Sequence, residues 1–286
     1  MVLGVLTSGN LGLNILSQIE SRFMIGFVLT DSNSIKIIDF CKLKKIPYYI
    51  GNPRNNKAYE FIKNITVDII ASINYLFLIN KDIINHSDKL TFNIHGSLLP
   101  KYRGRTPHVW AIINNEKETG ITAHKIDEGC DTGDIIEQII IPIDISDTGN
   151  DILQNYKKYY FKLVLDVVSK CEDNTLQFKK QNEKFATYFG KRTPSDGKIE
   201  WDWQKERIKN WVRAQSNPYP GAFAFFENNK IIIDEVKFSE IGYNDEIDNG
   251  IVLANEPNII VKTPNGPLEL TKLRTPIELS LGCKLN

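Results

Sequence analysis

The first half of the chain alternates short apolar segments with segments of helical periodicity, and this alternation constrains its fold more than any other feature. The apolar segments are residues 2–6, 24–29, 47–50 and 67–73. Continuous apolar strands separated by helices are typical of a parallel sheet that is covered on both faces. We therefore predict an α/β fold with a doubly wound, mostly parallel sheet.

The pattern changes after the first two thirds of the chain. Residues 189–202 are polar and rich in Gly and Pro, which is typical of a connector. Short strand-like segments follow, such as residues 222–226, and Asn265-Gly266 is a hairpin turn signal. We predict an α/β domain over residues 1–188, a connector over 189–202, and a small β domain resembling an open barrel over 203–286.

The amino-acid composition argues against several classes of protein. The 286 residues include 35 Lys and Arg against 35 Asp and Glu, so the basic excess of proteins that grip nucleic acid backbones is absent. No apolar stretch reaches the roughly 18 residues of a spanning helix, and the first residues lack a cationic leader. The four cysteines are far apart, which favours reduced thiols. We expect a cytoplasmic protein that binds neither nucleic acid nor membrane.

The densest cluster of reactive side chains is Asn-Ile-His-Gly-Ser-Leu-Leu-Pro-Lys-Tyr-Arg-Gly at residues 93–104. Residues 91–95 have the alternation of a strand, so Asn93 and His95, two residues apart, leave the same face. Open α/β sheets bind ligands at the carboxyl ends of their strands. An asparagine amide can donate to a developing oxyanion, and an imidazole can take or give a proton near neutral pH.

A second motif is Asp-Glu-Gly-Cys-Asp-Thr-Gly at residues 127–133, in a loop between two predicted strands. It lacks the alternating ligand spacing of a calcium loop, so we predict no metal there. A third feature is the small-residue turn at residues 7–12, which opens a helix. Its N–H groups suit a substrate phosphate, although a tight turn without a ligand fits the sequence equally well.

The remaining histidines have simpler interpretations. We expect His86 to be a surface residue, because it lies in a polar stretch, and His124 to be a structural residue in the middle of a strand. His108 follows the main motif closely, and either a substrate contact or a packing role fits it.

The motifs at residues 93–104 and 127–133, together with Arg-Thr-Pro-Ser-Asp-Gly at 192–197 and Asn-Pro-Tyr-Pro-Gly-Ala at 217–222, resemble the 10-formyltetrahydrofolate-dependent formyltransferases. The resemblance implies a Rossmann-like catalytic domain, 10-formyltetrahydrofolate as the formyl donor, and no metal. It also implies the following residue roles. The catalytic residues are Asn93, His95 and Asp131. The residues that bind the folate are Tyr75, Phe77, Leu78, Ile79, Asp127 and Glu128.

Two branches of that family act on methionyl-tRNA or on nucleotide-linked aminosugars. The tRNA branch inserts a long basic loop after the second strand, whereas here residues 29–35 run directly into a helix. Residues 105–112 resemble the sugar N-formyltransferases. The expected acceptor is therefore a dTDP-linked 3- or 4-amino-dideoxyhexose for surface polysaccharide (lipopolysaccharide, O-antigen type) biosynthesis. The alternatives are a methionyl-tRNA formyltransferase and a non-catalytic module that binds folate or a nucleotide sugar.

The implied mechanism needs no covalent intermediate. His95 accepts the proton of the attacking amine, Asn93 stabilises the tetrahedral oxyanion, and Asp131 orients His95 or a water and assists proton delivery to the leaving nitrogen. The expected substrate-binding residues are Ser8, Gly9, Asn10, Lys101, Tyr102, Arg103, Arg105, His108 and Tyr219, the last by stacking on a base. A homodimer is expected. The sequence leaves open which sugar carbon carries the amine, whether the nucleoside is thymidine or uridine, and what the β domain does.

Overall fold

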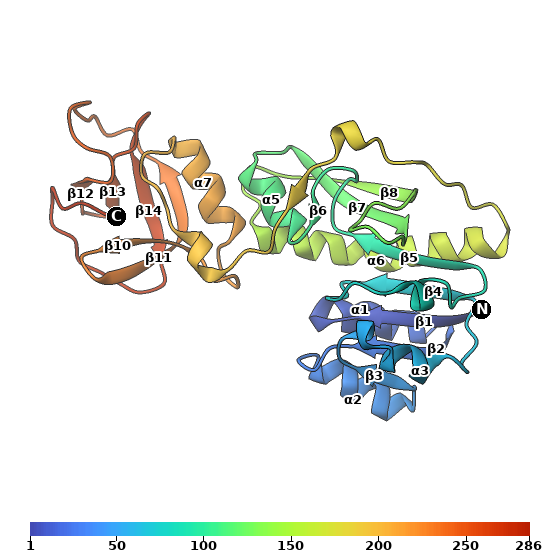
Figure 1. Ribbon diagram of the computed structural model, residues 1–286. Helices are drawn as coiled ribbons and strands as arrows, with labels where there is room; N and C mark the ends of the chain where they lie inside the picture. The colour runs from blue at the N-terminus through green and yellow to red at the C-terminus, as the bar shows by residue number, and fades with distance from the viewer. The chain divides into compact units, whose positions relative to one another are not determined.

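The computed structural model describes residues 1–286, apart from the side chain of Asn55. The chain divides into two compact units (Figure 1). The first unit comprises Met1–Gly104, Thr119–Ile141 and Asn155–Phe189. The second comprises Arg105–Glu118, Pro142–Gln154 and Gly190–Asn286. Two segments far from the C-terminus, residues 105–118 and 142–154, thus belong to the unit formed mainly by the C-terminal residues.

The first unit contains a seven-stranded sheet in the order β3-β2-β1-β4-β5-β7-β8. Its strands are β1 (Val2–Thr7), β2 (Met24–Thr30), β3 (Tyr48–Ile50), β4 (Ile69–Ile73), β5 (Leu90–His95), β7 (Glu118–Lys125) and β8 (Ile135–Pro142). The pairs from β3 to β5 are all parallel, and β7 runs antiparallel to β5. The predicted doubly wound, mostly parallel sheet is confirmed.

Helices cover both faces of this sheet. Ala58 and Ile62 of α3 (Lys57–Ile62) and Ile83 of α4 (Lys81–Ile84) pack in one buried cluster with strand residues such as Leu6. Thr7 points to the opposite face from Leu6, and there α1 (Gly9–Glu20) approaches so closely that a Cβ on Gly12 would overlap Thr7. This close approach explains a glycine inside the first turns of a helix.

Two helices and two short strands complete the first unit. Helix α2 (Ile35–Lys44) packs against α1, and the long helix α6 (Gly149–Glu172) buries one apolar face from Tyr156 onward. Strands β6 (Arg103–Gly104) and β9 (Tyr188–Phe189) form a small parallel ladder. Short 3₁₀ turns lie at Pro53–Asn55 and Glu183–Phe185 in this unit and at Pro194–Gly197 in the second unit.

The second unit has a five-stranded antiparallel sheet in the order β10-β11-β14-β13-β12. Its elements are α5 (Pro107–Ile113), α7 (Lys205–Ala214), β10 (Ala222–Phe226), β11 (Asn229–Phe238), β12 (Val252–Ala254), β13 (Ile259–Val261) and β14 (Leu268–Leu273). Ile208, Trp211 and Val212, spaced for one face of α7, pack into the core formed with the sheet. The predicted smaller C-terminal β domain is confirmed.

Within the described part of the chain, no helix combines the length and the apolar character needed to cross a membrane.

Candidate active site

Asn93 and His95 lie at the carboxyl end of β5, as predicted from their spacing. Strand β5 is interior to the sheet, between β4 and β7. The antiparallel register with β7 places Asn93 opposite His124 and His95 opposite Thr122. His95 is buried, and Asn93 is half-buried. The strand thus presents one amide and one imidazole at the sheet edge where ligands bind in open α/β sheets.

The contacts of His95 determine which of its ring nitrogens carries hydrogen. Nε2 lies 2.8 Å from the carbonyl oxygen of Tyr102, and a carbonyl only accepts, so Nε2–H is the donor. Nδ1 faces the carboxylate of Asp131, with 3.5 Å to Oδ2. Burial lowers the pKa of His95, and the charge of Asp131 offsets this only in part. The ring is therefore neutral near pH 7 and can take up a proton at Nδ1.

Asp131 is held between two imidazoles. Its Oδ2 accepts the N–H of Gly104 at 2.9 Å, and its Oδ1 lies 3.6 Å from Nε2 of His124. Burial by itself would raise the pKa of Asp131, but the positive charge that His95 and His124 carry when protonated and the hydrogen bond from the Gly104 N–H hold it well below its usual range. The carboxylate is therefore ionised and can stabilise positive charge on His95.

His124 belongs to this cluster, although its position in mid-strand suggested a purely structural residue. Its Nδ1–H donates to the carbonyl of Lys125 at 2.9 Å, which leaves Nε2 as an acceptor for the Asn93 amide, Nδ2 to Nε2, at 3.1 Å. This bond orients Asn93 and leaves its other N–H hydrogen for an acceptor in the substrate. Only the strand register, which places the two residues opposite each other, would have revealed the pair.

The structure brings the two expected folate segments together. Nζ of Lys81, which follows residues 75–79 closely, lies 2.8 Å from Oε1 of Glu128. Leu78 is 51% exposed, and Tyr75 and Phe77 pack edge to face with their ring centroids 5.5 Å apart. Asp127 accepts the N–H of Gly129 and so shapes its own loop. An exposed apolar segment beside a loop of backbone donors and acceptors suits a flat heteroaromatic ring.

The turn that was expected to bind a phosphate already has a hydrogen-bond acceptor from the protein itself. The N–H of Gly9 donates to Oγ of Ser34 at 2.9 Å, and Ser34 donates to the buried carboxylate of Asp31 at 2.6 Å. A carboxylate beside the helix N-terminus repels an anion. These contacts favour the alternative in which the turn at Ser8, Gly9 and Asn10 binds no ligand.

Arg103 does not offer its charge to solvent, contrary to the expectation of a phosphate contact. Its side chain has no exposed surface, and its guanidinium pairs with Glu183 and donates to Gln181 and Tyr188. Tyr102 is also buried, and its ring stacks on that of Phe189 at 4.9 Å. Both residues therefore have packing roles in the β6–β9 ladder.

The other expected cations lie in different units. Lys101, in the first unit, and Arg105, in the second, are both exposed. They stay candidates for a phosphate contact.

His108 and Tyr219, both expected at the substrate site, meet within the second unit. Nε2 of His108 lies 2.8 Å from the hydroxyl of Tyr219. Burial lowers the pKa of His108 to about 4 and raises that of Tyr219 to about 12. Both groups are therefore neutral near pH 7, as suits residues that bind by hydrogen bonding and stacking rather than by charge.

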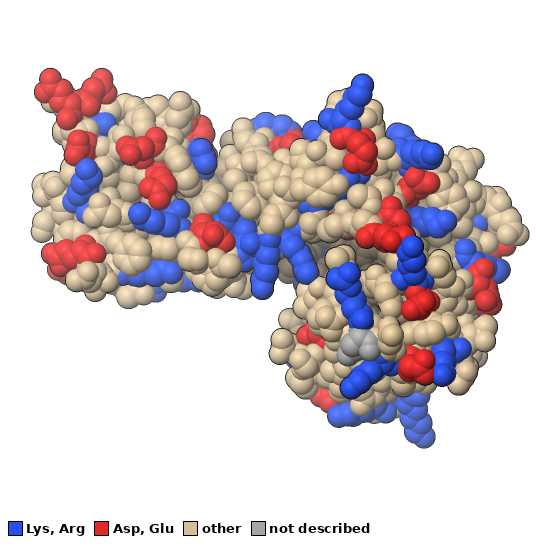
Figure 2. All heavy atoms as spheres, viewed as in Figure 1, with Lys and Arg blue, Asp and Glu red and all other residues tan. Residues whose placement is uncertain are grey.

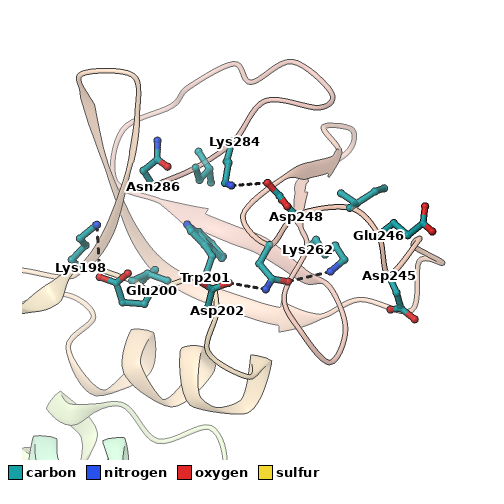
Figure 3. Close-up of a pocket in the computed structure, with 14 residues that line it drawn as sticks. Lys198, Glu200, Trp201, Asp202, Asp245, Glu246, Asp248, Lys262, Lys284 and Asn286 are labelled. Atoms are coloured by element: carbon teal, nitrogen blue, oxygen red, sulfur yellow. Dashed lines mark hydrogen bonds and ion pairs between the residues drawn. The ribbon is translucent and has the colours of Figure 1, made fainter.

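The second unit also has a polar pocket (Figure 3). It is lined by residues 198–202, 245–249, Lys262 and 284–286. Its polar and charged groups bind one another: Nζ of Lys284 lies 2.8 Å from Asp248, and Asn249 donates to Asp202 at 2.8 Å. None of the expected site residues lines this pocket, so we assign it no part in the reaction.

Two further observations concern the remaining His, Cys and acidic residues. Where side chains are described, no three or more His, Cys, Asp or Glu are grouped so as to hold a metal ion. His86 was expected at the surface, but it is half-buried, its Nε2 lies 2.9 Å from the carbonyl of Ile65, and its ring is near Phe27 and Tyr59.

Two relatives of known structure cover nearly the whole chain. One is WlaRD, a sugar 3N-formyl transferase solved with dTDP and 5-N-formyl-THF, which is 26% identical and covers 97% of this chain and 99% of its own, with a TM-score of 0.75. The other is an N-formyltransferase from Helicobacter canadensis in complex with folinic acid and dTDP-3-aminofucose, at 27% identity over 96% of this chain and 100% of its own, with a TM-score of 0.75.

A curated relative is the bifunctional polymyxin resistance protein ArnA of Wigglesworthia glossinidia brevipalpis. It is 34% identical over 265 residues, which are 88% of this chain and 39% of that protein. This chain therefore spans about two fifths of the length of ArnA. The formyl transferase family matches residues 26–168, and its C-terminal domain matches residues 191–278. Since the first match alone covers half of the chain, and the second follows it in order, this chain belongs to the formyltransferase family.

Proposed function

We propose that this protein is a folate-dependent N-formyltransferase that moves a formyl group from 10-formyltetrahydrofolate to the amine of a dTDP-linked 3- or 4-amino-dideoxyhexose. One observation carries the proposal. The hydrogen bond from Nε2–H of His95 to a carbonyl leaves Nδ1 as the basic nitrogen, 3.5 Å from an ionised Asp131. A neutral imidazole backed by a carboxylate is suited to accept the proton of an attacking amine.

Each residue of the cluster has a distinct task in amine formylation. The amine becomes acidic as it attacks, and Nδ1 of His95 takes its proton. Asp131 stabilises the resulting imidazolium, which holds the proton until it passes to the leaving nitrogen. The Asn93 N–H that His124 leaves unused can donate to the oxygen that gains negative charge.

The donor supplies an electrophilic formyl carbon, and the chain has a fitting place for its ring. The exposed apolar segment at residues 75–79 and the loop at 127–133, joined by the Lys81–Glu128 ion pair, would hold the pterin. We propose that Tyr75, Phe77, Leu78, Ile79, Asp127 and Glu128 form this site. The two relatives solved with 5-N-formyl-THF or folinic acid support this choice of donor.

The choice of acceptor rests on relatives and on the second unit. The same two relatives are a sugar 3N-formyl transferase solved with dTDP and an N-formyltransferase solved with dTDP-3-aminofucose. The His108–Tyr219 pair offers an uncharged aromatic ring and a hydroxyl, as a pyrimidine base requires. We further expect a cytoplasmic homodimer that serves the biosynthesis of surface polysaccharide.

The test is an acceptor panel. The purified protein is incubated with 10-formyltetrahydrofolate and dTDP- and UDP-linked 3-amino and 4-amino sugars, with initiator methionyl-tRNA in parallel. The product is read as the mass gain of one formyl group. We expect one dTDP-sugar to be formylated with kcat/KM above about 10⁴ M⁻¹s⁻¹. Formylation of the tRNA alone would reject a sugar acceptor.

Two substitutions test the catalytic set in the same assay. Asn93→Ala removes the amide donor and is expected to lower kcat by about 10²–10³-fold. His95→Asn removes the base and is expected to lower kcat by about 10²–10⁴-fold. If both variants keep wild-type turnover, the assigned roles are wrong, and a binding module without catalysis becomes the better interpretation.

A further inference from the structure

Gln181 contacts the loop that carries Asp131, although it lies outside both motifs. Its Nε2 donates to the carbonyl oxygens of Asp131 at 2.8 Å and Gly133 at 2.7 Å. Its Oε1 accepts from Nε and Nη2 of Arg103 at 3.2 and 2.8 Å. Carbonyls only accept and a guanidinium only donates, so the orientation of this amide is unambiguous. Both the amide nitrogen and the amide oxygen of the Gln181 side chain are therefore used.

Arg103 gives Gln181 a rigid support. Its side chain has no exposed surface, and its guanidinium donates to the hydroxyl of Tyr188 as well as to Gln181. Its own backbone N–H donates to the carbonyl of Thr187 at 2.8 Å. Just before Gln181, the backbones of Lys179 and Ile135 exchange two hydrogen bonds. The chain is thus fixed on both sides of Gln181.

Asp131 needs such support because of its backbone. Its φ is +57°, in the left-handed region that residues with a side chain adopt at a cost. Such conformations persist only where the surroundings hold them. Gln181 holds the carbonyl of Asp131 itself and that of the residue two further on, so its amide spans the left-handed residue. The carboxylate then reaches the Gly104 N–H and Nδ1 of His95.

We infer that Gln181, supported by Arg103, is a positioning residue that keeps Asp131 in the conformation in which its carboxylate faces His95. The inference rests on the proposed function for the identity of the reaction, whereas the geometry of the loop can be measured in the protein alone.

Kinetics of three variants test the role. Gln181→Leu removes all four bonds, and Gln181→Glu keeps an acceptor for Arg103 but sets a carboxylate against two carbonyl oxygens. For both, we expect kcat to fall by about 10–100-fold, as for other supporting partners of a site, with each KM within about threefold. The matched control is Glu183→Gln. Glu183 also binds Arg103, but its side chain is 66% exposed and the bonds that fix Asp131 come from Gln181. Its kcat should stay within about twofold.

The pH profile separates positioning from general damage. His95 is faced by Asp131, His124 and Arg103, and Asp131 has Tyr160 as a further titratable neighbour. When Asp131 moves away, the imidazolium loses its stabilising charge. The acidic limb of kcat/KM should then shift to lower pH in both Gln181 variants and stay in place in Glu183→Gln. A purely structural defect lowers the fraction of active enzyme without moving the limb.

Hydrogen exchange of the free protein requires no substrate. In the Gln181 variants, we expect amide exchange to become faster than in the wild type in a peptide covering residues 126–134 but not in the rest of the chain. In Glu183→Gln, we expect no change. Unchanged exchange in that peptide, a uniform increase over the whole chain, or an equal loss of kcat in Glu183→Gln would overturn the inference. If the wild-type protein formylates no acceptor, the proposed function fails, and the exchange result still decides the role of Gln181.

Discussion

At the residue scale, the hydrogen bond between Asn93 and His124 gives the first prediction. His124→Leu removes the acceptor for Nδ2 of Asn93, so the amide loses its fixed orientation. We expect kcat to fall by about 10–100-fold with little change in KM. His124→Gln, which keeps an acceptor oxygen, should recover part of the loss. Steady-state kinetics in the formylation assay check both, and full turnover in His124→Leu would contradict the role.

A second residue, His108, makes the stability of the second unit depend on pH. Its pKa is lowered from 6.5 to about 4, so unfolding takes up a proton between these values. The folded state therefore keeps the full contribution of the neutral His108 above about pH 6.5, and this contribution to the free energy of unfolding is lost as pH falls towards about 4. Because the side chain is half-buried and partly screened, His108 should account for a loss of about 1–2 kcal/mol between pH 7 and about pH 5.

Urea unfolding followed by tryptophan fluorescence measures this loss. Trp110, Trp201, Trp203 and Trp211, the four tryptophans of the chain, all belong to the second unit, so their emission reports on that unit. In His108→Gln, the difference in unfolding free energy between the two pH values should shrink by the stated amount. An unchanged difference in His108→Gln would show that another titratable group causes the dependence of stability on pH.

At the scale of elements, the β6–β9 ladder depends on a glycine. Gly104 has a φ of +101°, and a Cβ there would overlap the carbonyl oxygen of Phe189. Its N–H also donates to Asp131. Gly104→Ala should therefore separate the two strands, destabilise the protein by about 1–3 kcal/mol, and lower kcat by about 100-fold. Thermal unfolding and kinetics test this.

Gly190→Ala is the matched control for that substitution. Gly190 follows β9 directly, and a Cβ there would meet nothing within 4 Å. We expect its stability to stay within about 0.5 kcal/mol of the wild type. Equal effects of the two substitutions would mean that the close approach at Gly104 is not what matters.

At the scale of the whole molecule, charge distinguishes the sugar acceptor from tRNA. Lys and Arg balance Asp and Glu at 35 each, and Figure 2 shows acidic side chains interspersed among the basic ones. Retention of initiator tRNA on filters should therefore be weak, with a Kd above about 10⁻⁶ M at physiological salt. Tight binding that weakens steeply with salt would support the methionyl-tRNA alternative.

Features that depend on residues close together in the sequence were predictable, whereas features that depend on contacts between distant residues were not. The order of strands and helices in the first half follows from local apolar periodicity, and Asn93 and His95 share a face because they are two residues apart on a strand. The burial of Arg103 was not predictable, because its partners Gln181 and Glu183 lie 78 and 80 residues away. The contact of Ser34 with Gly9, 25 residues away, and that of His86 with Ile65, 21 residues away, were hidden for the same reason.

The sequence by itself determined the α/β and β architectures and the placement of Asn93 and His95 on one face of a strand, because these depend on local spacing. The motifs at residues 93–104 and 127–133 added Asp131 to this pair only through their resemblance to a known family. Only the tertiary structure decided that His124 orients Asn93, that Gln181 holds Asp131, and that residues 105–118 join the second unit. Each of these depends on strand register and long-range packing, which local periodicity does not encode.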